Sequence, residues 1–227
     1  MELKNTMNKI NTLLIESSDT ISELCLLGKK HSTDKSPLNT SGFRHPYTAV
    51  YNMLFANLKY KPICFGEIGI YKNSSTKCWR EFFPNAKIMA YEYSSEFIEQ
   101  AKSHNLCNVD YHFLNIKDIQ SIELGLGAAG ELFDVLIDDS THEIQDEIRL
   151  INIAPKYLKP GGILIIEDIF LKQSHEEYET GIEQTKKYYS HTTFIRTEHK
   201  DRHSPGWDND KMLVLFRNNI DYEHNAN

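Results

Sequence analysis

Acidic side chains gather at the ends of two apolar segments in the second half of the chain. The stretch DVLIDDSTH carries Asp139 and His142, and the stretch LIIED ends in Glu167 and Asp168. Three carboxylates that converge repel one another unless a cation or a proton neutralises them, and hard oxygen ligands favour magnesium, calcium or manganese. A histidine beside such a site can take a proton from a hydroxyl that the metal polarises. The pattern predicts metal ligation by the three acids and a general-base role for His142.

The elements that must position these residues alternate between short apolar runs and helical periods from about residue 61 onward. Such alternation indicates βαβ units around a parallel sheet. We therefore predict an α/β fold with a Rossmann-like, seven-stranded, mostly parallel sheet and helices on both faces. The segment 1–60 is predicted as a helical extension with a lid-like loop, 61–218 as the ligand-binding domain and 219–227 as a polar tail. The expected strands are ICFGEIG, AKIMAYE, VDYHFLN, FDVLIDD, GGILIIED, TTFIRTEH and KMLVLFRN, the last two forming a hairpin.

Polar residues follow the ends of these strands, where open α/β sheets bind their ligands. Glu67 and Gly69 begin the turn after the first strand, and Glu92 ends the next one. Dinucleotide-binding folds place an acid about 20 positions on to bind a ribose hydroxyl, and Gly69 lets a ligand approach the backbone. The few glycines argue against a pyrophosphate cradle and favour S-adenosylmethionine (SAM), although a plain strand-turn-helix is the alternative. Asn115 and Asp138, at the next strand ends, complete the expected cofactor side.

Two polar loops each allow two interpretations. The segment 31–47 precedes the sheet and is rich in turn formers. It either folds over the cofactor site as a lid, as functional loops commonly do, with Lys35 and Tyr47 touching the cofactor, or it is an exposed linker. A later loop, DRHSPGWDND, carries Trp207 among polar side chains. It either offers stacking and hydrogen bonds to a carbohydrate or simply closes a hairpin.

The composition limits the classes of partner that the protein is expected to bind. The 227 residues include 32 Asp and Glu against 25 Lys and Arg, a net charge of −7, whereas a surface that binds nucleic acid normally carries a basic excess. No apolar run approaches the ~20 residues of a membrane span, and the first residues lack the pattern of a signal peptide. Four scattered cysteines without CxxC spacing indicate reduced thiols in a cytoplasm. We therefore expect a cytoplasmic protein without nucleic-acid or membrane partners.

Several strings along the chain, taken in order, resemble one family. HSTDK, HPYTAVY, EIGI, FFPNAKIMAYE, DVLIDDSTH and LKPGGILIIED are similar to the metal-dependent, SAM-dependent class I O-methyltransferases of macrolide sugars, the mycinamicin and tylosin group, and to cephalosporin hydroxylase-type proteins. The resemblance runs from about Gly28 to Asp168, and its TDK, DD-x-x-H and ED motifs are the specific part. The chain departs from the family in NSS, where relatives are richer in glycine, and it is shorter than the macrolide enzymes.

This resemblance implies a catalytic side and a cofactor side. The three acids and the histidine named first would match the family's metal ligands and general base. The cofactor side would match the SAM-binding turn at Glu67 and Gly69, the ribose acid Glu92 and an adenine contact at Asn115.

Together these observations predict a SAM-dependent O-methyltransferase that acts on a hydroxyl of a sugar or sugar-bearing metabolite. Its cofactors would be SAM and a divalent cation, with magnesium as the first choice, and residues 61–218 would form the SAM-binding methyltransferase domain. The substrate would be a small molecule or a nucleotide-linked sugar. The alternatives are an NAD-dependent oxidoreductase, a non-catalytic nucleotide-binding module, and a phosphate-ester or phenol acceptor; a homo-oligomer is left open.

Overall fold

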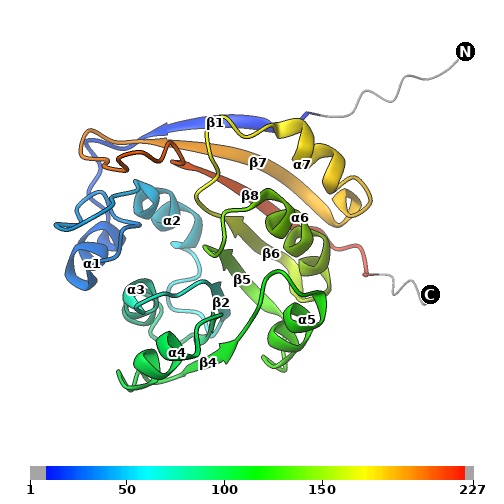
Figure 1. The fold of residues 1–227 in the computed structure, drawn as a ribbon, viewed down its shortest axis with the longest axis horizontal. Helices are drawn as coiled ribbons and strands as arrows, with labels where there is room; N and C mark the ends of the chain where they lie inside the picture. Colours follow the sequence, from blue (N-terminus) through cyan, green and yellow to red (C-terminus); the bar gives the residue numbers. More distant parts are fainter. Residues whose placement is uncertain (1–8, 223–227) are drawn as a thin grey trace, which may run out of the picture.

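A twisted sheet runs through the molecule and carries helices on both of its faces (Figure 1). The computed structural model describes residues 9–222. Within this range the sheet has eight strands in the order β1-β7-β8-β6-β5-β2-β3-β4. The strands are β1 (Asn11–Glu16), β2 (Cys64–Ile68), β3 (Lys87–Glu92), β4 (Val109–Phe113), β5 (Phe133–Asp138), β6 (Leu158–Ile166), β7 (Tyr189–Glu198) and β8 (Lys211–Arg217).

The strand directions place the carboxyl ends of five strands at one edge of the sheet. Strands β2 to β6 are parallel to their neighbours among themselves, while β8 runs antiparallel between β6 and β7. The predicted Rossmann-like, mostly parallel class and the final hairpin are confirmed. Because helices return the chain between parallel strands, the residues that follow each strand converge on that edge.

The eighth strand differs from the sequence-based expectation. Residues 11–16, included above in a helical extension, form β1 and pair in parallel with β7, with Asn11 opposite Thr193 and Glu16 opposite Glu198. Strand β1 lies at the edge of the sheet, and most of its side chains on both faces are exposed. Its Leu-Leu-Ile run therefore shows no alternation, which is the pattern by which a half-buried strand is normally found. The boundary predicted at residue 60 stays a prediction.

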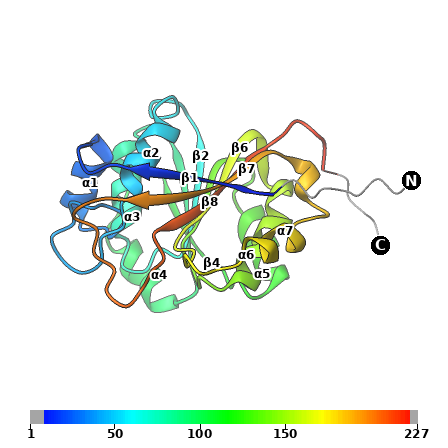
Figure 2. The ribbon, with the colours of Figure 1, turned by 90° about the horizontal axis from the view of Figure 1, so that it is seen from above.

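The helices form two layers that sandwich the sheet (Figure 2). One apolar core lies under α1, α2 and α3, and the other lies under α5, α6 and α7. All five residues of the central strand β2 are buried, as expected for a parallel strand covered on both faces. The helices are α1 (Glu23–His31), α2 (Tyr47–Phe55), α3 (Ser74–Phe82), α4 (Ser95–Lys102), α5 (Ile119–Gly127), α6 (Ile144–Ile153) and α7 (His175–Gly181), with short 3₁₀ turns η1 (Ala154–Lys156) and η2 (Lys186–Tyr188).

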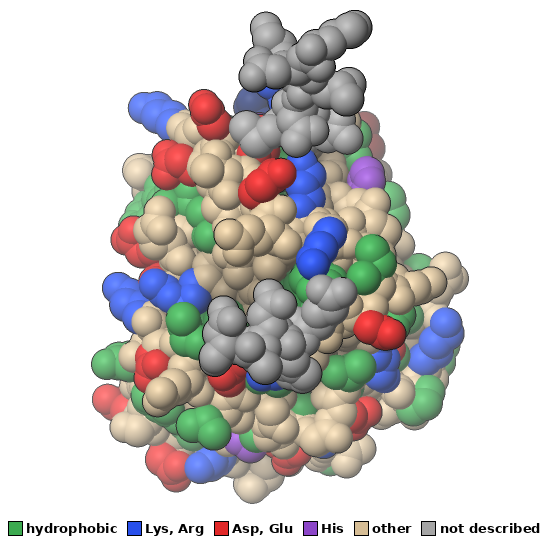
Figure 3. Space-filling model, turned by 90° about the vertical axis from the view of Figure 1, so that its right-hand side faces the viewer, with side chains coloured by type: hydrophobic (Ala, Val, Ile, Leu, Met, Phe, Trp, Pro, Cys, Tyr) green, Lys and Arg blue, Asp and Glu red, His purple; other side chains and the backbone are tan. Residues whose placement is uncertain are grey.

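Three global features bear on the predicted setting. All four cysteines are free thiols, as expected. Among residues 9–222, every helix falls short of the length and apolar character that crossing a bilayer requires. On the face shown in Figure 3, acidic and basic side chains are scattered among one another rather than sorted by sign. The cytoplasmic location and the absence of nucleic-acid partners stay predictions, as does the polar tail, most of which lies outside the described residues.

Candidate active site

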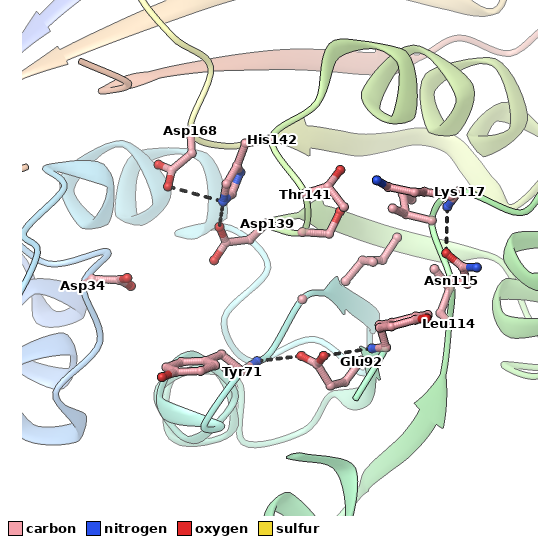
Figure 4. Close-up of a pocket in the computed structure, with 15 residues that line it drawn as sticks. Asp34, Tyr71, Glu92, Leu114, Asn115, Lys117, Asp139, Thr141, His142 and Asp168 are labelled. Carbon is pink, nitrogen blue, oxygen red and sulfur yellow. Dashed lines mark hydrogen bonds and ion pairs between the residues drawn. The ribbon is translucent and has the colours of Figure 1, made fainter. Parts of the chain in front are cut away.

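A cavity of about 670 Å³ opens at the carboxyl ends of β2 to β6. Figure 4 shows the side chains of Glu92, Asp139, His142 and Asp168 turned toward this space. The cavity therefore lies at the sheet edge where the polar strand ends in the sequence predicted a ligand site. Six of the predicted site residues line it: Gly69, Glu92, Asn115, Asp139, His142 and Asp168.

The turn after β2 brings the backbone unusually close to the neighbouring strand end. Gly69 has a φ of +88°, and a Cβ added there would lie 2.1 Å from the carbonyl oxygen of Asp139. Only glycine accommodates both the left-handed backbone and this approach. The turn thus presents bare backbone to the cavity, as expected from the glycine in the sequence.

Glu92 is held in one orientation by backbone donors. Its Oε2 accepts a hydrogen bond of 2.9 Å from the N–H of Tyr71 (Figure 4). Its Oε1 accepts bonds of 2.9 Å from the N–H groups of Tyr93 and Ser94. A carboxylate fixed this way at a cavity wall is suited to accept hydrogen bonds from two adjacent hydroxyls. Leu114 and Ile116 also line the cavity and add apolar surface to it.

Asp139, His142 and Asp168 come together at the other end of the cavity. One ligand atom from each lies within 4.8 Å of the others, and Nε2 of His142 is 3.9 Å from Oδ1 of Asp139 and 3.9 Å from Oδ2 of Asp168 (Figure 4). These separations are too long for hydrogen bonds but leave room for an ion between the groups. His142 and Asp168 also have φ values of +55° and +57°. Such backbone strain in non-glycine residues is concentrated at functional sites.

Behind this cluster, Lys35 inserts a buried positive charge among carboxylates from three strands. Its side chain is 2% exposed, and Nζ donates to Glu167 at 2.6 Å and to Asp139, with Glu67 3.7 Å away. Burial opposes the charge, yet Asp139 and Glu167 hold the pKa of Lys35 well above its usual value. Glu167 also accepts a hydrogen bond from the hydroxyl of Tyr51. Its carboxylate is therefore paired with Lys35 and Tyr51 instead of joining the Asp139 cluster.

Five predicted site residues do not line the main cavity, because their polar atoms are engaged behind its wall. Glu67 is fully buried and accepts from the indole of Trp79 and the hydroxyls of Ser75 and Thr76. Burial raises the pKa of Asp138 to about 6, and Ser140 donates to its carboxylate at 2.6 Å. The residues in this layer are Lys35, Tyr47, Glu67, Asp138 and Glu167.

The segment 31–47 is an anchored layer of the site rather than an exposed linker. The carbonyl of Lys35 accepts from the N–H groups of Tyr47 and Thr48 at the start of α2. The hydroxyl of Tyr47 donates to Oδ1 of Asp168 at 2.7 Å. Lys35 and Tyr47 thus contact the candidate metal ligands Asp139 and Asp168, whereas both were expected to touch the cofactor.

His45 supports the same cluster from this segment. Its Nδ1 lies 2.9 Å from Oδ1 of Asp210 and 3.8 Å from Oδ1 of Asp168. Burial alone would lower its pKa, but the two carboxylates raise it to about 9. A protonated His45 therefore offsets part of the negative charge around Asp168.

Sequence reasoning missed two residues that matter to this geometry. The backbone of Tyr71, with a φ of +44°, directs its N–H at Glu92. Asn209 lies in the loop before β8, and its carbonyl accepts from Tyr47 at 3.0 Å. The string DRHSPGWDND contained Asn209, but only the meeting of two distant loops makes it part of the site.

A model of the family described as "Methyltransferase domain" matches residues 73–218. The chain belongs to the methyltransferase domain family. Among curated relatives of this methyltransferase domain, 8-demethyl-8-(2-methoxy-alpha-L-rhamnosyl)-tetracenomycin-C 3'-O-methyltransferase of Streptomyces olivaceus is 25% identical over 180 residues, 72% of this chain and 41% of the relative. Mycinamicin VI 2''-O-methyltransferase of Micromonospora griseorubida is 29% identical over 143 residues, 57% of this chain and 33% of the relative. The methyltransferase domain thus spans less than half the length of either relative.

Solved structures share the architecture of this methyltransferase domain. MycE methyltransferase of the mycinamycin biosynthetic pathway, in complex with Mg, SAH and mycinamycin VI, gives a TM-score of 0.65 at 18% identity, covering 87% of this chain and 55% of that chain. The O-methyltransferase TomG of Streptomyces achromogenes, in complex with SAM, gives 0.55 at 16% identity, covering 88% and 91%. These likenesses confirm the class I methyltransferase fold, and the relatives confirm the resemblance to the mycinamicin group.

Proposed function

We propose that this domain transfers the methyl group of SAM to a hydroxyl of a sugar-bearing small molecule. One observation carries the proposal: a single cavity joins the wall with Gly69 and Glu92 to the cluster of Asp139, His142 and Asp168. Methyl donor and acceptor would meet in one space, as direct transfer requires. The family and the names of two relatives, both O-methyltransferases and one of them naming a rhamnosyl group, support this reaction.

The cavity fits SAM better than a dinucleotide. The Glu92 carboxylate is fixed where it can accept from both ribose hydroxyls, and Gly69 opens the backbone beside it. The turn that joins β2 to α3 contains one glycine, Gly69. It therefore lacks the Gly-rich phosphate cradle that an NAD site uses. SAM, when bound, supplies a methyl group on a positively charged sulfonium. The carboxylates of Asp34 and Asp139 at the cavity wall would favour that charge.

The same wall fits a divalent cation. Asp139 and Asp168 offer hard carboxylate oxygens close enough to share one ion, whereas Glu167 could join them only by turning away from Lys35. A bound divalent cation polarises the acceptor hydroxyl and lowers its pKa. Magnesium is the first choice because it prefers oxygen ligands.

His142 would take the proton that the acceptor hydroxyl loses. The acceptor oxygen would form its bond to the methyl carbon while the carbon–sulfur bond of SAM breaks and leaves its electron pair on sulfur, and the ring of His142 would accept the hydroxyl proton. The products are the methyl ether and S-adenosylhomocysteine. A positioned base of this kind contributes roughly 10²–10⁴-fold to the rate.

Calorimetry and one variant test the proposal. The protein should bind S-adenosylhomocysteine and SAM, with no comparable response to NAD. His142→Ala should keep this affinity, because the ring lies with Asp139 and Asp168 at the end of the cavity away from Glu92, and should lose roughly 10²–10⁴-fold in turnover. Micromolar NAD binding without any response to S-adenosylhomocysteine would refute the proposed methyl transfer. Full turnover in excess chelator would show that the reaction does not need a metal ion.

A further inference from the structure

We propose that a second, smaller cavity beside the catalytic cluster is the acceptor subsite and that it receives one neutral sugar ring between Phe43 and Trp207. This inference rests on the proposed function and specifies where and how its acceptor is held. The cavity measures about 190 Å³, and it shares Asp34, His142 and Asp168 with the main cavity. A ring seated in it would therefore lie beside His142 and Asp168, with a hydroxyl within reach of the base.

Two loops from opposite ends of the chain build this subsite. Phe43 belongs to the segment before α2, and Trp207 belongs to the loop between β7 and β8. The loops are tied together where Arg44 and His203 exchange backbone hydrogen bonds of 2.9 and 3.0 Å. The subsite is thus a fixed opening between the two loops.

The aromatic rings of the subsite are exposed but braced from behind. Phe43 is 40% and Trp207 47% exposed. Phe170 stacks on Trp207 with ring centroids 5.5 Å apart, and His45 stacks on Phe43 at 6.3 Å. Rigid, exposed aromatic faces at a small cavity are suited to cover the apolar C–H face of a sugar ring.

Asn209 supplies a second, independent sign of a ligand. It lines the subsite, is 3% exposed, and its Oδ1 makes no hydrogen bond within the described part of the chain. Buried polar atoms normally have a partner, and an orphan calls for an explanation. A hydroxyl of a seated sugar would donate to this oxygen.

The size and polarity of the subsite narrow the ligand class. Pockets that take drug-sized ligands measure roughly 300–1,000 Å³, so 190 Å³ suits one ring, with the rest of the metabolite outside. Asp34, Asp168 and Asn209 all present acceptor oxygens. They call for a ligand with several hydroxyl donors, and the two carboxylates disfavour a phosphate ester.

Tryptophan fluorescence tests this assignment directly, because the chain has two tryptophans and only one of them lies at the subsite. Trp79 is 1% exposed, with its indole N–H on Glu67, so a ligand-induced change reports on Trp207. The full chain, saturated with S-adenosylhomocysteine and Mg²⁺, is titrated with methyl α-L-rhamnopyranoside. We expect a saturable change that Asn209→Ala weakens about three- to tenfold.

A second readout removes the reporter itself. By ligand-observed NMR, Trp207→Ala should weaken rhamnoside binding about tenfold or more. Tyr60→Ala removes an aromatic ring that is 68% exposed and lies outside the subsite, and it should leave rhamnoside binding unchanged. S-Adenosylhomocysteine affinity should stay within twofold in every variant. Three outcomes would overturn the sugar subsite while that affinity is intact. They are no binding of the rhamnoside, rhamnoside binding that Trp207→Ala does not change, and saturable binding of catechol instead of the rhamnoside. If the unaltered protein does not bind S-adenosylhomocysteine, the proposed function itself is refuted.

Discussion

Replacing Lys35 should reveal how much the buried charge network holds the site together. Lys35→Met keeps the side-chain length but removes the ammonium that pairs with Asp139 and Glu167 and lies 3.7 Å from Glu67. Removing one partner of a buried ion pair costs about 3–5 kcal/mol, because the other charge stays buried without compensation. Domains are stable by roughly 5–15 kcal/mol, so the variant should lose a large share of its free energy of unfolding.

Urea unfolding followed by circular dichroism measures this loss. With slopes of about 1–3 kcal/mol per molar urea, the midpoint of Lys35→Met should fall by at least about 1 M. Lys30→Met is the matched control, because Lys30 also pairs with a glutamate but is 59% exposed. Exposed pairs are worth about 0–1 kcal/mol, so this control should unfold close to the wild type.

Magnesium gives the experiment a second comparison. Without the ammonium, the carboxylates behind the cavity carry one more uncompensated negative charge, so Mg²⁺ should stabilise Lys35→Met more than the unaltered protein. The reasoning fails if Lys35→Met unfolds at the same urea concentration as Lys30→Met. It also fails if Mg²⁺ shifts both proteins equally.

Three further predictions follow from single contacts. Gly69→Ala should lose at least about 1–3 kcal/mol of stability and most of its S-adenosylhomocysteine affinity by calorimetry, because its Cβ would overlap the Asp139 carbonyl; unchanged binding would refute a close backbone approach. Glu92→Gln should weaken the affinity for S-adenosylhomocysteine about 10–100-fold, which corresponds to the loss of a charged hydrogen bond. An unchanged affinity would show that Glu92 does not bind the ribose. Burial raises the pKa of Glu147 from 4.5 to about 7, so its stability contribution falls as pH rises through that range. The free energy of unfolding of Glu147→Gln should therefore exceed that of the wild type by up to about 3 kcal/mol at pH 8 and by less at pH 5. Urea unfolding that gives the same difference at both pH values would contradict this prediction.

The sequence was sufficient to predict strands β2 to β8 and the strand ends that face the cavity, but not the edge strand β1. Each of the strands β2 to β6 has an apolar core and a polar end, so period and position alone placed Glu92, Asp139 and Asp168 at one edge. The burial of Lys35 could not be predicted this way. Its partners Asp139 and Glu167 stand 104 and 132 positions away, and a lysine in a polar segment normally lies in solvent.

Loop residues escaped prediction for a related reason. Asn209 becomes a candidate ligand only because the segment before α2 meets the loop before β8 at Arg44 and His203. No local periodicity records such a meeting, since it depends on the whole sheet being assembled. The interpretation of the late loop as a carbohydrate contact stays a prediction that the rhamnoside titration tests.

The pairing of β1 with β7 sets the order in which the chain can fold as it is synthesised. Thr193 donates its hydroxyl proton to the carbonyl of Asn11, 182 positions earlier. At roughly 5–20 residues per second, a ribosome needs about 9–36 s to make that stretch, and during this time the β1 segment lacks the strand with which its backbone pairs. Long-range pairing of this kind slows folding, and a free apolar strand invites association with other chains. Nascent chains arrested before β7 should therefore depend on chaperones, and the β1 segment should be where those chaperones bind.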